Sequence, residues 1–268
     1  MNPMSKVATT IVVQACCGTY LGLLAVGLGR QLSGSPRVYP VTVDVALLLS
    51  LCLAISLAVV LVGRRDESLS RAGAARRRRR CWLWGGLFLL GLSSQAVLLA
   101  AGSANPAARS LLSIAAGVAG LALIASSGQQ VQRSAGPQVA PGIGQLLGWA
   151  TALMCGGLLT AIVVMSVDVS GGADVGYDPA KLGVVAAMLG LGAILDGCRW
   201  RHPAHTGAGP ASSRDIVLGA LGGAALVLVE PRVPPAWDFA GLVLLLALVI
   251  AREGSLLTWY LFGPRVAD

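Results

Sequence analysis

The side chains that could do chemistry are few and are scattered along the chain. The two histidines, His202 and His205, are three residues apart in "RWRHPAHTGAG". A zinc site normally needs three or four ligands, and the only thiol near this pair is Cys198. We therefore expect this segment to be a solvated loop, and the sequence predicts no bound metal and no other cofactor.

A serine pair is the next candidate for chemistry. Ser93 and Ser94 precede Gln95 in the apolar run "GLSSQAVLL". A serine nucleophile needs an activating base, and no histidine, lysine or aspartate of an apolar run is placed to act as one. Hydroxyl and amide side chains inside apolar helices usually hydrogen-bond to a neighbouring helix. We therefore expect a non-enzymatic protein with no catalytic residues.

Transport of an ion would normally use an ionisable group near the middle of the membrane. The charged residues of the apolar runs fall instead near the ends of those runs. They are Asp44, Asp196, Glu230, Arg252 and Glu253. If the protein is a carrier, Asp44 is the candidate transport site. The alternative interpretation is that Asp44 lies at the membrane interface.

The elements that carry these residues are expected to be transmembrane helices. Of 268 residues, 55% are hydrophobic and 12% are charged, whereas soluble domains carry about 25% charged residues. Because a spanning helix needs about 20 apolar residues, the sequence predicts an all-α polytopic membrane protein, a single domain of about eight helices with both termini cytoplasmic. The expected spans are 7–29, 41–63, 81–102, 110–127, 145–167, 181–197, 215–230 and 236–251.

The orientation follows from the Lys and Arg residues, which are more frequent on the cytoplasmic side of membrane proteins. Of the 20 in this chain, the outer segments are expected to hold only Arg30, Arg37, Arg109, Lys181 and Arg232. The basic cytoplasmic loop 64–80 ends in an arginine run followed by tryptophans. Carrying these charges through the bilayer would cost several kcal/mol each. We therefore expect a topology anchor formed by Arg76, Arg77, Arg78, Arg79, Arg80, Trp82 and Trp84.

The arginine run also sets the expected partners. It would attract anionic lipids of the bilayer. Nucleic acid is not expected as a partner, because a loop of this length is too short to form a folded basic domain. Cys81 follows the run directly and is a candidate for lipidation by S-palmitoylation; the alternative is an unmodified thiol.

Small residues at a spacing of four mark candidate helix-packing faces. Gly18 and Gly22 lie in "GTYLG", and Gly219 and Gly223 lie in "GALGG". In lipid, such pairs allow two helix backbones to approach closely. The pattern leaves open whether the partner helix belongs to the same chain or to a second copy, so the oligomeric state is not predicted.

One segment also resembles a known family. The run "YDPAKLGVVAAMLGLGAILDGCRW" has an aromatic residue and Asp-Pro before a helix of small residues, then an acidic residue and a basic loop. These features are Tyr177, Asp178, Pro179, Gly190, Gly192, Asp196 and Arg199. They resemble the multi-pass envelope proteins of alphaherpesviruses, the unique-long-forty-three family. The runs "VQACCGTYLGLLAVGL" and "SLLSIAAGVAGLALIA" fall in the corresponding order. This chain would be a shortened or divergent member, because the family's long polar insert is reduced to "CRWRHPAHTGAGPASSRD".

The resemblance implies a protein of the virion envelope and of host cell membranes, with viral envelope glycoproteins as partners. It would modulate membrane fusion by these glycoproteins or their trafficking. A likeness of the family to equilibrative nucleoside transporters implies an alternative, a facilitative transporter or channel. A further alternative is a GC-rich bacterial integral membrane protein of unknown role. The family has no established catalytic or binding residues, so none is carried over.

Overall fold

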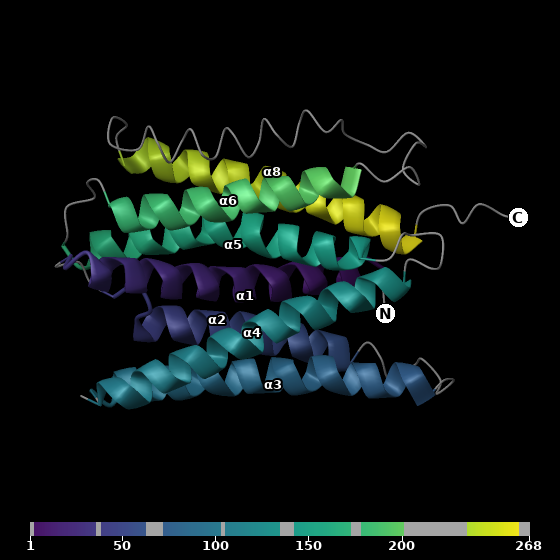
Figure 1. The fold of residues 1–268 in the computed structure, drawn as a ribbon, viewed down its shortest axis with the longest axis horizontal. Helices are drawn as coiled ribbons and strands as arrows, with labels where there is room; N and C mark the ends of the chain where they lie inside the picture. The colour runs from purple at the N-terminus through teal and green to yellow at the C-terminus, as the bar shows by residue number, and fades with distance from the viewer. Residues whose placement is uncertain are drawn as a thin grey trace, which may run out of the picture.

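The structure is a computed structural model that describes residues 3–35, 39–62, 72–102, 105–134, 142–172, 178–200 and 235–262. Within these residues every regular element is an α-helix, and the helices lie roughly alongside one another in a bundle (Figure 1). They are α1 (Pro3–Leu32), α2 (Val43–Val62), α3 (Ala72–Ala100), α4 (Pro106–Ser134), α5 (Ile143–Ser170), α6 (Pro179–Trp200) and α8 (Pro235–Phe262).

Six of these helices are long and apolar enough to cross a membrane, and α2 carries a shorter apolar run, Val43–Val59. Large apolar side chains also point outward from the bundle, for example Leu51 on α2, Leu90 on α3, Ile114 on α4 and Leu248 on α8. In water this surface would be costly to expose, whereas lipid tails cover it. The prediction of an all-α polytopic membrane protein is therefore confirmed.

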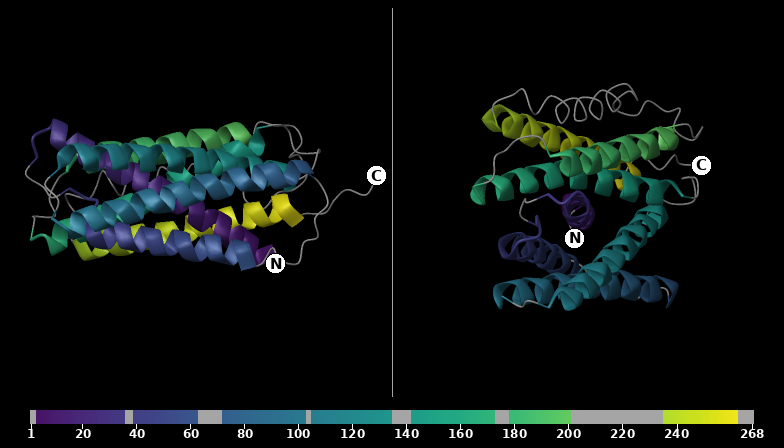
Figure 2. Two further views of the ribbon diagram at one scale, coloured as in Figure 1. Left: turned by 90° about the horizontal axis from the view of Figure 1, so that it is seen from below. Right: turned by 60° about the vertical axis from the view of Figure 1, so that its left-hand side comes forward.

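The bundle is built around α1 and α5. In each of these helices 72% of the apolar span is buried, against at most 39% in the other spans. Figure 1 shows α1 between α5 and α2, with α6 and α8 on the far side of α5. Figure 2 shows α4 crossing obliquely from α3 towards α5. Polar side chains on α1 and α5 are therefore the ones most removed from lipid and water.

Helices α6 and α8 run in the same direction. Near their ends, Asp196 of α6 contacts Arg252 of α8, and both helices begin at the opposite end of the bundle (Figure 1). The expected span 215–230 lies outside the described residues. The start of α1 and the end of α8 lie at one end of the bundle, which we call the inner end (Figure 1).

Every described helix except α2 extends beyond its predicted span, and three of the extensions decide where charged residues lie. Arg30, expected in an outer segment, lies in the last turn of α1. The expected loop 64–80 is helical from Ala72 onward, so the arginine run belongs to α3. Helix α8 continues to Phe262, so Arg252 and Glu253 lie inside a helix rather than at its end. Arg30, Arg252 and Glu253 therefore lie within helices rather than in the flanking segments, and their charges are paired within the bundle.

Side-chain capping explains where α4 and α6 begin. At the start of α4, the Asn105 side-chain oxygen accepts hydrogen bonds from the N–H groups of Ala107 and Ala108 at 3.1 and 3.2 Å. At the start of α6, the Asp178 Oδ1 accepts one from the Ala180 N–H at 3.1 Å. A proline follows each cap, where its missing N–H costs nothing. Asp178 thus fixes the first turn of α6 at the outer end.

Candidate functional site

The centre of the bundle is closed by direct backbone contact between α1 and α5. A Cβ atom added to Gly18 would overlap the carbonyl oxygen of Ala152, and one added to Gly156 would lie 2.5 Å from the carbonyl carbon of Gly18. A Cβ atom on Gly22 would meet the Thr160 hydroxyl. The predicted packing residues Gly18 and Gly22 thus both face α5 of the same chain. Gly219 and Gly223 lie outside the described residues.

A hydrogen-bonded chain of polar side chains links α1, α3 and α4. The Tyr20 hydroxyl donates to Gln95 Oε1 at 2.8 Å, and Gln95 Nε2 donates to Ser113 Oγ at 2.6 Å. The Tyr20 ring makes an edge-on contact with Phe88, with 5.5 Å between the ring centroids. Gln95 is buried, and Ser93 is half-buried beside it. This polar patch, considered above for catalysis, therefore ties three helices together.

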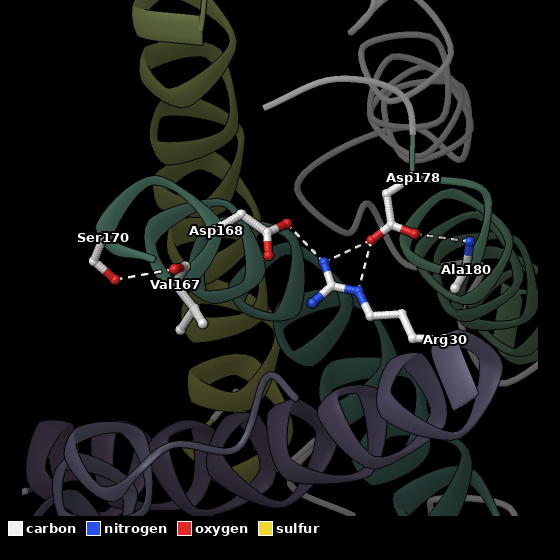
Figure 3. Close-up of polar contacts among 6 residues, drawn as sticks. All are labelled: Arg30, Val167, Asp168, Ser170, Asp178 and Ala180. Carbon is white, nitrogen blue, oxygen red and sulfur yellow. Dashed lines mark hydrogen bonds and ion pairs between the residues drawn. The ribbon is translucent and has the colours of Figure 1, made fainter. Parts of the chain in front are cut away.

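An outer ion-pair cluster joins α1, α5 and α6 (Figure 3). The Arg30 guanidinium donates from Nε and Nη2 to Asp178 Oδ2 at 2.9 and 2.7 Å, and from Nη2 to Asp168 Oδ2 at 2.6 Å. At most 3% of each side chain is exposed. Charges buried to this degree are tolerated only when they are paired and hydrogen-bonded. The cluster therefore fixes the outer ends of three helices against one another.

A second buried pair of opposite charges occurs at the same end. Lys181 in the first turn of α6 and Asp238 in the first turn of α8 are both 3% exposed, and Lys181 attracts the Asp238 carboxylate. Lys181 was expected in an outer segment, and it lies at the outer end as part of a helix. The outer ends of α6 and α8 are thus linked electrostatically.

An inner ion-pair cluster joins α5, α6 and α8. Arg252 donates from Nη2 to Asp196 Oδ2 at 2.7 Å and from Nη1 to Glu253 Oε1 at 2.8 Å. The second oxygen of that carboxyl, Glu253 Oε2, lies 2.8 Å from Thr151 Oγ1 on α5. Asp196 and Glu253 are fully buried, whereas 15% of the Arg252 side chain is exposed. Ionisable groups inside transmembrane helices mark functional sites by default, so this cluster is the candidate functional site.

A buried amide lies close to the inner cluster. Gln14 of α1 donates from Nε2 to Ser127 Oγ of α4 at 3.1 Å. Its Nε2 lies against Gly148 of α5, one helical turn before Thr151, and residues at this spacing are neighbours on a helix face. The inner half of the bundle therefore concentrates polar groups from α1, α4, α5, α6 and α8.

The residues predicted from the sequence as a transport site, a topology anchor and a lipidation site lie outside the two ion-pair clusters. Asp44 is exposed in the first turn of α2 and belongs to neither ion-pair cluster. Arg79 and Arg80 are exposed at the start of α3, where Cys81, Trp82 and Trp84 are half-buried. The side chains of Arg76, Arg77 and Arg78 lie outside the described set. The roles predicted for these residues as topology anchor and lipidation site stay predictions.

The residues that make the clusters were not predicted as site residues. A usable signal was nevertheless present. Arg30 follows the expected span 7–29, and Asp168 and Asp178 lie between the expected spans 145–167 and 181–197, which places all three on the side expected to be outer. Opposite charges confined to one side, each next to an apolar run, are candidates for pairing. For Glu253 the spacing of charges along one helix gives no such signal, since its partner Thr151 is an uncharged residue of another helix.

Neither a metal centre nor a disulfide is found in the described part of the chain. No group of three or more His, Cys, Asp or Glu residues there could hold a metal ion, and Cys16, Cys17, Cys52 and Cys155 are free thiols. His202 and His205 lie outside that part. The expectation that no metal or cofactor is bound stays a prediction.

Comparison of the chain with protein-family models, with curated proteins and with solved structures gives no match. The class of protein therefore rests on the fold and the site. Together they define a multi-pass α-helical integral membrane protein with ion pairs at both ends of its helices.

Proposed function

We propose that the protein is a non-enzymatic viral envelope membrane protein that modulates membrane fusion, or the trafficking of fusion glycoproteins, by lateral contact within the membrane. The support is the resemblance of Tyr177–Trp200 to the alphaherpesvirus envelope family. The two acidic residues of that stretch, Asp178 and Asp196, hold opposite ends of α6 through Arg30 and Arg252. This observation carries the proposal, because it gives the shared pattern a structural role beyond a common Ala- and Gly-rich composition.

The packing of the bundle supports the same proposal. The α1–α5 contact at Gly18 and Gly156 is too close for a route between these two helices. The polar side chain of Gln95 is occupied by contacts to Tyr20 and Ser113 of neighbouring helices. Meanwhile α2, α3, α4 and α8 present large apolar side chains outward. In lipid, helices associate through such surfaces by packing and by occasional hydrogen bonds.

A cell–cell fusion assay tests this function. Coexpression of the protein with a viral set of fusion glycoproteins should reduce fusion. Surface staining of the glycoproteins separates an effect in the membrane from withdrawal of the glycoproteins from the surface. Asp196→Asn should weaken the effect by releasing one end of α6, whereas the matched change Asp44→Asn at an exposed carboxylate should preserve it. Unchanged fusion with the wild-type protein at equal glycoprotein expression would exclude this function.

A second candidate function is facilitated transport of a small polar solute such as a nucleoside. It is favoured by Glu253 and Asp196, which are fully buried within helices that could span the membrane. Uptake of radiolabelled nucleoside into liposomes containing the purified protein tests it. Glu253→Gln should abolish uptake and Asp44→Asn should not. If uptake into liposomes with the protein does not exceed uptake into protein-free liposomes, transport is excluded and the fusion function is retained.

A further inference from the structure

Helix α3 presents one continuous face outward along the inner half of its apolar span. Figure 1 shows α3 at the edge of the bundle, and only 33% of its apolar span is buried. On the side that packs against the bundle, Phe88 and Leu92 are fully buried. The opposite side carries exposed residues at spacings of three and four, which share one face of a helix. We call this face the α3 stripe; it consists of Arg79, Arg80, Leu83, Gly86, Leu87 and Leu90.

The α3 stripe is charged where the apolar span begins and apolar beyond that point. The apolar span of α3 starts at Arg79, so the guanidinium groups of Arg79 and Arg80 lie at the boundary of the membrane. The half-buried Trp82 is in the next turn, and indole rings favour the headgroup layer. The leucines of the stripe are 44–64% exposed. A positive headgroup contact therefore lies directly above a strip of apolar side chains.

The length of the stripe matches one leaflet of a bilayer. Leu90 follows Arg80 by ten positions, which is about 15 Å along a helix. This is half of the hydrocarbon core, which is about 30 Å thick, and so equals the depth that an acyl chain reaches. Gly86 leaves a gap in the side chains midway, since a Cβ atom added there has nothing within 4 Å. An acyl chain can therefore lie close to the helix between Leu83 and Leu90.

The two guanidinium groups favour an anion as the polar part of the occupant. They are adjacent positive charges near the start of a helix, where the helix dipole is also positive. Helix α3 contains no Asp or Glu residue. A phospholipid phosphate supplies acceptor oxygens at this depth, and guanidinium groups bind phosphate through paired N–H donors. A headgroup with net negative charge is favoured over phosphatidylcholine, whose choline adds a positive charge.

We propose that the α3 stripe binds one anionic phospholipid of the leaflet in which α3 begins, with its phosphate on Arg79 and Arg80 and an acyl chain along the leucines of the stripe. The sequence predicts only a general attraction of the arginine run to anionic lipids. The α3 stripe adds a defined site that selects both the headgroup and the chain. This inference is independent of the fusion function, because lipid binding is measured on the purified protein alone.

Native mass spectrometry of the full-length protein in a non-ionic detergent tests the headgroup contact. The wild-type protein should bind phosphatidylglycerol more tightly than phosphatidylcholine with the same acyl chains. The double variant Arg79→Gln/Arg80→Gln should lower the affinity for phosphatidylglycerol by roughly 25-fold, about fivefold for each guanidinium. Both arginines are exposed, so this variant should fold.

The matched control for charge is Arg109→Gln, at the start of α4 and the other end of the bundle. It should change the affinity by less than about twofold, because charges further apart than a Debye length are largely screened. Equal binding of the two lipids by the wild-type protein overturns the proposal. Phosphatidylglycerol binding that survives the double substitution also overturns it.

A second comparison tests the apolar part of the site. Gly86→Trp keeps both arginines and fills the gap in the stripe, so it should weaken phosphatidylglycerol binding several-fold. The matched control Gly190→Trp, at an equally open position on α6, should leave binding unchanged. Inorganic phosphate at the same concentration as the lipid should not displace it, because it lacks acyl chains.

Three outcomes of this comparison contradict a lipid site on the stripe. Equal affinities of Gly86→Trp and Gly190→Trp would mean that no acyl chain lies along α3. Displacement of the lipid by inorganic phosphate would mean that the arginines bind phosphate alone. A dimeric mass without bound phosphatidylglycerol would mean that a second copy of the chain covers the stripe.

Discussion

Arg30 donates through both Nε and Nη2 to a single oxygen of Asp178, Oδ2, across 148 positions of sequence. The same Asp178 side chain caps the first turn of α6 through its other oxygen, Oδ1. One carboxylate thus joins the end of α1 to the start of α6 and sets where α6 begins. Both side chains are almost completely buried, so neither charge could be left alone at low cost.

The first prediction concerns the loss of this arginine. Arg30→Gln should destabilise the bundle by about 3–5 kcal/mol, because removing one partner of a buried ion pair leaves the other charge uncompensated. Thermal or denaturant unfolding of the protein in detergent measures the loss. The matched change Asp44→Asn, at an exposed carboxylate, should alter stability by less than about 0.5 kcal/mol.

A compensating variant separates charge burial from packing at this site. Arg30→Met combined with Asp168→Leu and Asp178→Asn removes all three charges and retains a capping side chain at residue 178. It should recover most of the lost stability, since apolar replacement of a buried ion pair is often neutral or favourable. A triple variant as unstable as Arg30→Gln would mean that Arg30 acts through its shape rather than its charge.

Hydropathy predicts the helices well because a helix that crosses a membrane needs a run of about 20 apolar residues. The long apolar runs of α1 and α5 are examples. The sequence did not predict the ends of α1 and α8, since Arg30 and Glu253 look like boundary residues when they are read alone. They remain inside helices because Asp178 and Thr151, from distant parts of the chain, provide hydrogen-bond partners. Partners of this kind belong to the tertiary structure and have no signature in a local window.

The candidate site was missed for a related reason. Asp44 stood out because it is an acidic residue just inside an apolar run, but an exposed carboxylate in a first helical turn is simply solvated and favoured by the helix dipole. Asp196 appeared equally terminal in the sequence, yet it is fully buried against Arg252. Which of the two carboxylates is buried depends on the helices packed around it, and this packing cannot be read from the residues next to it in the sequence.

The second prediction concerns the α1–α5 contact. Gly18→Ala and Gly156→Ala should each cost about 1–3 kcal/mol, because an added methyl group meets the facing backbone and the two helices must separate. The matched control is Gly86→Ala on α3, where an added Cβ atom has nothing within 4 Å; it should not reduce stability. Melting temperatures of the three purified variants in one detergent measure the difference. Equal temperatures for Gly18→Ala and Gly86→Ala would contradict close packing at Gly18.

The third prediction concerns the hydrogen-bonded chain between α1, α3 and α4. Gln95→Leu should cost about 1–3 kcal/mol, since it removes the acceptor of the Tyr20 hydroxyl and the donor to Ser113 and leaves buried polar groups unsatisfied. The control Ser166→Ala removes an exposed hydroxyl that bonds only to its own helix, at the Ile162 carbonyl oxygen, and should be nearly neutral. Unfolding of both variants under identical conditions is the measurement. A Gln95→Leu protein as stable as Ser166→Ala would show that the chain contributes little to the bundle.

The fourth prediction concerns orientation in the membrane. A tag inserted near Gly73, at the start of α3, should be reached by antibody only after cells are permeabilised, because the arginine run beside it stays on the cytoplasmic side. A tag at Gly102, beyond the far end of α3, should be reached in intact cells, because a Cβ atom added there would have nothing within 4 Å.

Replacing Arg76 to Arg80 by glutamine should produce both orientations of α3, and therefore labelling of the Gly73 tag in a fraction of intact cells. The matched replacement of the same residues by lysine should preserve the wild-type pattern, because the orientation depends on the positive charge and not on the guanidinium group. Strong labelling of the Gly73 tag in intact cells expressing the wild-type sequence would reverse the assignment of inner and outer ends. It would place the Arg252–Asp196–Glu253 cluster on the outer side of the membrane.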